Sequence, residues 1–456
     1  MKRGAITCLL TWVFFSTAVP VGAESPDEPN QGRVVPRPGH VLAQRQRVEP
    51  VNRMLTERLN DLLPELMRET GIDMWLVLNR EYAEDPVFFT LVPDPVFAAR
   101  RTTMLVFHDR GPEAGVDRLS VNRYPFGELY EPAWEGGDLD AQWTALGELV
   151  AARDPRRIGV DVSRNWPVAD GLSAALRDRL LEVLPAALHE RVVGAEELVV
   201  RWMETRSPGE LAVYPQIVAL ARGVISEAFS SDVITPGVTT TEDVEWAIRQ
   251  RFHDLQLDPW FHPHVDLQRR GMDCPPEEPF CGGPGVIAPG DVLHTDVGVC
   301  YLRLCTDTQE MAYVARLGEE EVPPGLVAAL AVGNRWQDHL TSSFELGRTG
   351  NEILAATSAR CEADDILAST YTHPLGFFGH APGPVIGMWD NQGPTPVRGD
   401  WPLHASTVFS IEGNVKVAVP SWDGQLVQIA LEQDAVFDGE AVTYLAGRQT
   451  RWHLVR

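Results

Sequence analysis

Hydrophobic residues follow two different periods along the first half of the chain, and the change of period predicts helices and strands. Within residues 53–70 the leucines fall on one face of a helix, at positions 55, 59, 62, 63 and 66. The sequence predicts further helices at 141–153 and 171–185, and strands at 72–79, 102–109 and 157–163. This alternation predicts a small α/β domain over residues 46–203.

The pattern changes at Ser207. The segment SPGE places Ser207 as an N-cap, Pro208 at the first helical position and Glu210 where its side chain can reach back to the cap. A long helix ending near Ser231 should follow. We therefore expect a second domain over residues 204–456.

This second domain contains an internal repeat. ALARG at 219–223 returns as ALAVG at 329–333, and at the same offset Gly237 corresponds to Gly347. Each copy predicts a helix, a turn and a second capped helix. Two unrelated amphipathic helix pairs would be the simpler explanation, but the gap-free offset favours a duplicated half. Duplication predicts a pseudo-two-fold axis with one strand pair from each half near the centre.

Four acidic residues occur inside apolar, strand-like segments. Asp296 and Asp307 flank a short turn, so an antiparallel hairpin would bring them side by side, while Glu412 and Glu432 lie in two later strands. A single acid of this kind can be a solvent-facing strand residue. Four acids in two symmetric pairs instead suggest a shared cation, because adjacent like charges need protonation or a counter-ion.

Two histidines, His373 and His380, accompany these acids in THPLGFFGHAPG. The residues between them predict a turn or an edge strand, so the pair is not the helical His-x-x-x-His arrangement of zinc proteases. An isolated histidine is usually a surface or core residue. A functional role therefore depends on what surrounds it.

Taken in order, DVGVCYLRLCTD, HPLGFFGH, SIEG and LEQD resemble the motifs of the pita-bread metallopeptidases, which include methionine aminopeptidase, aminopeptidase P and prolidase. The resemblance covers residues 46–456, because the leading domain is similar to that of aminopeptidase P, prolidase and creatinase. It implies an α/β (α+β) chain whose C-terminal pita-bread fold is built from a duplicated half and follows a smaller α/β domain.

The resemblance also implies a dinuclear metal site. Five positions match its ligands, namely Asp296, Asp307, His373, Glu412 and Glu432. Such an oxygen-rich set suits two divalent ions, with manganese expected first and cobalt, zinc or iron as alternatives. By the same resemblance Asp307 and Glu432 bridge the metals, Glu412 is the general base and His380 stabilises the oxyanion.

A further catalytic histidine is expected upstream of the first aspartate. WFHPHVD offers His262 and His264, and we prefer His264. The segment RRGMDCPPEEPFCGGPG that follows resembles an insertion. Two positions depart from prolidase-like enzymes, since Ala430 replaces an arginine and Ala381 replaces an acid. The metal site is therefore better supported than specificity for Xaa-Pro bonds.

The N-terminus has the features of an export signal. Lys2 and Arg3 precede an apolar run that ends in small residues near Ala23, which predicts a signal peptide over 1–23 and a polar linker over 24–45. A membrane anchor is the alternative, but the run is short for a bilayer span. We therefore expect a periplasmic or secreted protein that is not bound to the membrane after processing.

Net charge and cysteine content limit which ligands and which disulfides are expected. The formal net charge of −25 makes nucleic acid an improbable ligand. Export permits disulfides, and Cys274 with Cys281 could close one loop, although five cysteines after the signal leave at least one thiol unpaired. The resemblance implies a homodimer and a small peptide substrate.

These observations predict an exported metallopeptidase, an aminopeptidase or dipeptidase, with Xaa-Pro bonds as one candidate substrate. The first alternative keeps the fold and metal site but acts on a non-peptide substrate. The second is a non-catalytic binding protein, against which the intact set of five ligands argues. No G-x-S-x-G motif supports a serine hydrolase.

Overall fold

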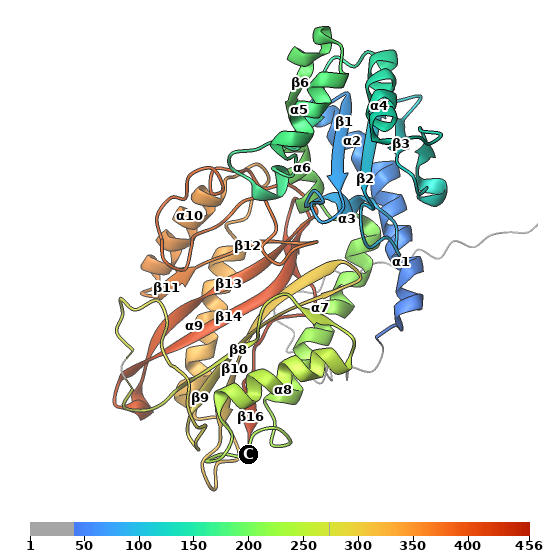
Figure 1. Ribbon diagram of the computed structural model, residues 1–456. Coiled ribbons are helices and arrows are strands. Elements are labelled where there is room, and N and C mark those ends of the chain that lie inside the picture. The colour runs from blue at the N-terminus through green and yellow to red at the C-terminus, as the bar shows by residue number, and fades with distance from the viewer. Residues whose placement is uncertain (1–40, 273) are drawn as a thin grey trace, which may run out of the picture. The chain divides into compact units, whose positions relative to one another are not determined.

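The computed structural model describes residues 41–272 and 274–456, so the predicted signal peptide lies outside the described residues (Figure 1). Within this range the chain forms two mixed sheets, one in each half of the sequence. No helix in these two ranges combines the length and the apolar character that a bilayer span requires.

The N-terminal half is built on a six-stranded sheet with the order β4-β3-β2-β1-β5-β6. Its strands are β1 (Met74–Arg80), β2 (Thr102–Asp109), β3 (Val116–Val121), β4 (Glu131–Pro132), β5 (Ile158–Val160) and β6 (Val192–Gly194). Its helices are α1 (Gln44–Glu57), α2 (Leu63–Thr70), α3 (Phe88–Leu91), α4 (Leu139–Arg153), α5 (Ala174–Val183) and α6 (Glu196–Glu204). Strand β2 has the predicted bounds, whereas β5 is shorter than predicted.

The leucine-rich helix is continuous but irregular, because a π-helical turn at Arg58–Leu62 joins α1 to α2. Arg58 in this turn is buried against Trp202 and pairs with Glu210 at 2.8 Å. Glu210 also closes the capping box on Ser207, as the sequence predicts. A single buried carboxylate thus links the first helix to the start of α7 (Pro208–Ala228).

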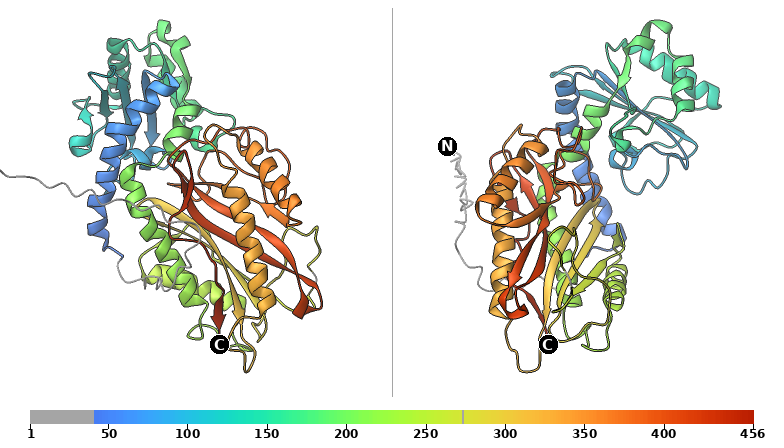
Figure 2. Two further views of the ribbon diagram at one scale, coloured as in Figure 1. Left: turned by 180° about the vertical axis from the view of Figure 1, so that it is seen from behind. Right: turned by 90° about the vertical axis from the view of Figure 1, so that its left-hand side faces the viewer.

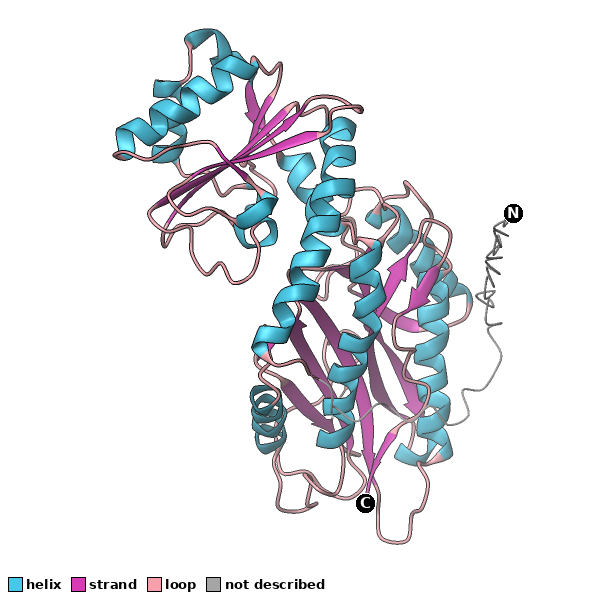
Figure 3. Cartoon of the chain, turned by 90° about the vertical axis from the view of Figure 1, so that its right-hand side faces the viewer, coloured by secondary structure: helices cyan, strands magenta, loops and turns pink. Residues whose placement is uncertain are grey.

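The C-terminal half is built on a ten-stranded sheet with the central order β11-β13-β14-β10-β9-β7. Its strands are β7 (Asp258–Pro259), β8 (His264–Gln268), β9 (Val292–Tyr301), β10 (Leu304–Val314), β11 (Leu367–Thr370), β12 (His373–Leu375), β13 (Thr407–Val419), β14 (Gln425–Phe437), β15 (Val442–Tyr444) and β16 (His453–Val455). Helices α7, α8 (Thr241–Asp254), α9 (Pro324–Thr341) and α10 (Gly350–Ala363) cover one face of this sheet (Figures 2 and 3).

The arrangement is the one expected of a duplicated half. Helix α7 packs on β9 and β10, α9 packs on β13 and β14, and the two strand pairs meet where β10 lies beside β14. The second helix of each pair begins with a capping box, at Thr240 in α8 and at Thr349 in α10. These caps are 109 residues apart rather than the 110 of the sequence repeat, so the first copy has one extra residue between its glycine turn and its cap.

Candidate metal centre

The predicted site residues lie in register across the large sheet. His264 on β8 pairs with Asp296 on β9, Asp296 pairs with Gln309 on β10, Gln309 pairs with Glu432 on β14, and Glu432 pairs with Glu412 on β13. Residues that are Cα partners share one face of a sheet. Three predicted ligands, Asp296, Glu432 and Glu412, therefore lie in one row across the sheet, together with His264 and Gln309.

A second line lies two residues further along the strands. Asp307 pairs with Gly298 on β9, its backbone N–H donates to the Asp434 carboxylate, Asp434 pairs with Ser410, and Ser410 pairs with His373 on β12. The hairpin predicted from the sequence is present, and it brings Asp296 and Asp307 to one face. They are diagonal neighbours on the same face, which is still within reach of two carboxylates.

The histidine of this second line is aimed at the acids. His373 is fully buried, and its Nδ1 hydrogen-bonds the carbonyl of Pro374 at 3.1 Å. A carbonyl oxygen can only accept a hydrogen bond, so Nδ1 must carry the proton. In the neutral ring Nε2 is therefore left with the free lone pair. That nitrogen lies 3.6 Å from Asp307, 3.7 Å from Glu412 and 3.9 Å from Glu432. A neutral imidazole thus presents an unused acceptor to three carboxylates.

These atoms are buried without partners among the described residues. Asp296 Oδ1, Asp307 Oδ1, His373 Nε2 and Glu432 Oε1 make no hydrogen bond there. Buried acceptors without donors cost free energy, and a cation supplies what they lack. Their atoms form overlapping groups within 4.8 Å, one of Asp296, Asp307 and Glu432 and another of His373, Glu412 and Glu432. The residues present therefore fit divalent metal ions.

The pKa values of these groups show the same electrostatic problem. Burial raises the pKa of Asp307 and Glu432 well above the usual range, the charge of Asp296 raises the pKa of Asp307 further, and the charge of Asp307 raises that of Glu432. Burial and the charge of Asp296 raise the pKa of Glu412, while burial raises that of Asp296 to about 6. Burial lowers the pKa of His373 to about 3. Without a cation, the site holds protons on its acids and none on its histidine.

His380 stands at the edge of the cluster. Its ring centroid is 4.6 Å from that of His373, and a nitrogen of each histidine lies within 4.8 Å of an oxygen of Asp307. Partial burial and the nearby positive charge of Arg398 lower the pKa of His380. The imidazole is therefore neutral at physiological pH and can donate one hydrogen bond.

Two glycines allow an indole to support this histidine. The Trp260 ring stacks edge-on against His380 at 5.0 Å, and its Nε1–H donates to the carbonyl of Thr306 at 2.9 Å. A Cβ placed on Gly298 would lie 2.0 Å from that indole, and one on Gly379 would lie 2.1 Å from it. The glycines of the DVG and GH motifs are thus explained by close packing of Trp260.

The predicted upstream histidine lies beside the cluster but outside it. The His264 side chain is 62% exposed and its nearest acids are Glu245, at 3.5 Å, and Asp266, at 3.6 Å. His262 packs instead against Trp246 on α8, with ring centroids 5.0 Å apart. His264 is the better placed of the two, because it is the Cα partner of Asp296.

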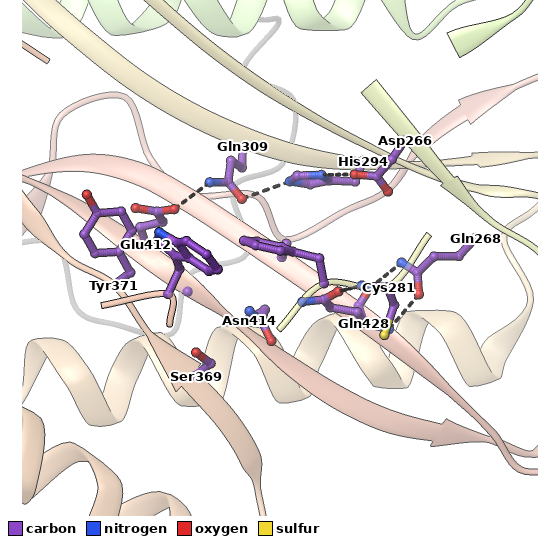
Figure 4. A pocket seen from close by; sticks show the side chains of 14 residues that line it. Asp266, Gln268, Cys281, His294, Gln309, Ser369, Tyr371, Glu412, Asn414 and Gln428 are labelled. Atoms are coloured by element: carbon purple, nitrogen blue, oxygen red, sulfur yellow. Dashed lines mark hydrogen bonds and ion pairs between the residues drawn. The ribbon is translucent and has the colours of Figure 1, made fainter. Parts of the chain in front are cut away.

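Sequence reasoning missed three residues that hold the acids in place. The Gln309 side-chain amide donates to Glu412 at 2.9 Å and to Glu432 at 3.0 Å, and its oxygen faces His294 Nε2 at 2.9 Å (Figure 4). His294 Nδ1 in turn faces Asp266 at 2.9 Å. Gln309 lies two residues after Asp307, which could have indicated that both side chains share one face.

The orientation of this chain of contacts follows from its two ends. The Gln309 amide must turn its NH₂ group to the two glutamates, so its oxygen accepts a hydrogen bond from His294 Nε2–H. Burial alone would lower the pKa of His294, but the charge of Asp266 and the hydrogen bond to it outweigh burial and raise that pKa. Both ring nitrogens of His294 therefore donate, and the amide is held in one orientation.

Comparison with known proteins agrees with this geometry. The profile of metallopeptidase family M24 matches residues 215–437, which contain all five predicted ligands. No curated protein sequence matches the chain.

Solved structures extend the likeness to both halves of the chain. An X-Pro aminopeptidase from Thermotoga maritima MSB8 superposes with a TM-score of 0.60 and 16% identity, covering 86% of this chain and all of that one. An Xaa-Pro dipeptidase from Bacillus anthracis superposes with a TM-score of 0.57 and 15% identity, covering 90% of this chain and all of that one. A prolidase from Pyrococcus furiosus superposes with a TM-score of 0.53 and 12% identity, covering 84% of this chain and 99% of that one. At these identities the likeness shows the fold, which is the pita-bread fold preceded by an α/β domain.

Replacing Gln309 by Leu should weaken metal binding by about 10–100-fold, because the ligand glutamates lose the amide that orients them. Gln449→Leu is the matched control, since the Gln449 amide is also buried but contacts only the backbone of Met311. Competition with a fluorescent chelator measures both affinities. Equal losses in the two variants would contradict the role assigned to Gln309.

Metal binding should also strengthen as pH rises. The acids have raised pKa values and so carry protons that the metal must displace, whereas His373, with a pKa of about 3, does not compete above pH 5. The rise in melting temperature on adding Mn²⁺ should therefore be larger at pH 8 than at pH 5.5. Scanning calorimetry at both pH values tests this, and an equal or larger rise at pH 5.5 would refute it.

Proposed function

Residues 215–437 place the chain in metallopeptidase family M24, and on that premise we propose that it is an exported dinuclear dipeptidase or aminopeptidase acting on Xaa-Pro bonds. The observation that carries the proposal is the convergence of four acids and one neutral histidine, in which three of the acids and the histidine have buried acceptor atoms without a partner among the described residues. Asp307 and Glu432 each belong to two of the possible ligand groups, as residues that hold both metals would.

The metals would supply Lewis-acid chemistry, polarising the scissile carbonyl and lowering the pKa of the attacking water. Manganese is our first assignment, because hard oxygen ligands outnumber the single nitrogen. Asp296, Asp307, His373, Glu412 and Glu432 would hold the ions. Gln309 keeps Glu412 and Glu432 from turning away.

The chain's own groups account for proton movement. Glu432 and Glu412 each accept a hydrogen bond from Gln309 through one oxygen and turn the other oxygen toward His373 Nε2, and Glu412 is the more exposed of the two. Partial exposure of its side chain lets it accept a proton from water, which the more deeply buried Glu432 cannot do as readily. The neutral His380 is placed to donate a hydrogen bond to the oxygen on which negative charge develops.

One cation near the site favours a substrate with a free carboxylate. Arg398 carries a buried Nε without a hydrogen-bond partner, and no acid within the described residues forms an ion pair with it. Its positive charge helps to lower the pKa of His380 and opposes the rise that burial causes in the pKa of Tyr371, so its electric field reaches the histidine side of the cluster. An unpaired, half-buried guanidinium suits a substrate carboxylate. A dipeptide would place its C-terminus there and its peptide bond over the metals.

Export and assembly are proposed on other grounds. The N-terminal sequence has the features of a signal peptide, and the disulfides Cys274–Cys281 and Cys300–Cys305 support an oxidising compartment, the periplasm or the exterior. Cys361 is then the one unpaired thiol among the described residues. A homodimer is proposed from the family resemblance alone.

Hydrolysis of Xaa-Pro dipeptides by the purified protein should require added metal and should fall by roughly a thousandfold in Asp307→Asn, since a lost ligand removes several kcal/mol of transition-state stabilisation. Asp365→Asn makes the same chemical change at an exposed position and should have no effect. Product release by chromatography and metal content are measured together. Full activity in Asp307→Asn would overturn the proposal, and bound metal without any peptide cleavage would favour a non-peptide substrate.

A further inference from the structure

A cavity beside the metal centre is lined by acidic and aromatic side chains, and the proposed reaction does not explain this lining. It encloses about 480 Å³ of space, part of which is open solvent. Asp266 and Glu412 bring acid groups to its wall, and Ala430 leaves room where a long side chain would fill it. No lysine or arginine lines it. His294, already hydrogen-bonded on both ring nitrogens, is its one basic residue (Figure 4).

The mouth of this cavity carries two aromatic rings from separate loops. Phe280 and Trp389 lie with their ring centroids 5.7 Å apart and a 33° angle between planes. Phe280 is 64% exposed and Trp389 is 48% exposed. Large aromatic side chains left in solvent at the rim of a polar cavity are typical of a ligand-binding surface rather than of a core.

The loop that carries Phe280 is fixed from several directions. The Cys274–Cys281 disulfide closes it, and Gln428 on β14 binds the residues on both sides of Phe280, donating to the carbonyl of Pro279 and accepting from the N–H of Cys281. The Lys416 ammonium on β13 donates to the carbonyls of Pro275 and Pro276. Phe280 is therefore held in place before any ligand arrives, which lowers the entropy cost of binding.

The cavity shares Glu412 with the metal centre and extends from it along one series of hydrogen bonds. From Glu412 the series passes through Gln309 and His294 to Asp266, and all four residues line the cavity. Arg398 is not among the lining residues. A dipeptide whose carboxylate meets Arg398 would therefore leave the cavity to the side chain of its N-terminal residue.

Two polar side chains in the cavity are free to meet a ligand. The Asn414 amide and the Ser369 hydroxyl line it, and neither makes a side-chain hydrogen bond to another described residue. Together with Asp266 they line the cavity with oxygen acceptors, and Phe280 and Trp389 add two aromatic faces to the same lining. Oxygen acceptors beside aromatic faces suit a long side chain that ends in a cation, and they repel a carboxylate.

We propose that this cavity binds the side chain of the substrate's N-terminal residue and favours lysine or arginine, with Phe280 and Trp389 packing on its apolar stem and cation. The inference rests on the proposed function for the direction of the substrate. It assigns a specificity role to the disulfide-closed loop and to the space beside Ala430, neither of which takes part in holding metal.

The test compares Lys-Pro with norleucine-Pro, which has the same stem without the ammonium group. The metal-loaded wild-type protein should give a kcat/KM about threefold to thirtyfold higher for Lys-Pro, with Glu-Pro the poorest substrate. Trp389→Leu should bring the ratio of Lys-Pro to norleucine-Pro toward one. Ala430→Arg, which puts a cation into the cavity, should reverse the preference in favour of Glu-Pro.

Calorimetric binding of lysine amide and norleucine amide keeps this test separate from catalysis. Tighter binding of lysine amide that depends on Trp389 would support the cavity assignment even if no dipeptide were cleaved, in which case the proposed function alone would fail. Hydrolysis of all dipeptides with equal kcat/KM, or equal binding of the two amides, would overturn the cavity assignment and leave the proposed function standing.

Discussion

The arrangement of the C-terminal half depends on one electrostatic constraint, the burial of four carboxylates on one face of a single sheet. Like charges at this distance cannot all ionise in a medium of low dielectric constant without a counter-ion. Among the described residues their one ionisable ion-pair partner is His373, whose pKa of about 3 leaves it neutral. The charge balance must therefore come from protons or from bound cations, and overlapping ligand groups favour cations.

Strand register is what brings these groups together. Side chains alternate between the faces of a strand, so a shift of one residue in β10 or β14 would turn Asp307 or Glu432 to the opposite face. The β10–β14 junction, where the two halves meet, sets Gln309 opposite Glu432 and between the two halves' ligands. The helices on the other face hold this register through the packing of α7 and α9. The strand register that stabilises the sheet therefore also sets the geometry of the site.

Sequence alone predicted many of the helices, strand β2 and the clustering of the four acids, because these depend on local patterns. Apolar periodicity predicted the helices and β2, and acids inside apolar strands, together with the family resemblance, predicted which side chains converge. Gln309 could not be found in this way, because its role depends on cross-strand register. A neutral amide in an apolar strand, unlike a carboxylate, does not by itself indicate a functional site. Arg398 and the Phe280–Trp389 pair were missed because they come together only when distant loops fold beside the sheet.

If the buried acids share two metal ions, anomalous diffraction from crystals grown with Mn²⁺ will locate both ions. Two peaks are expected, both within coordination distance of Asp307 and Glu432, with His373 on only one of them and its Nε2 turned to that metal. A map without peaks at these acids, or with a single ion bound elsewhere on the chain, would rule out a shared dinuclear site.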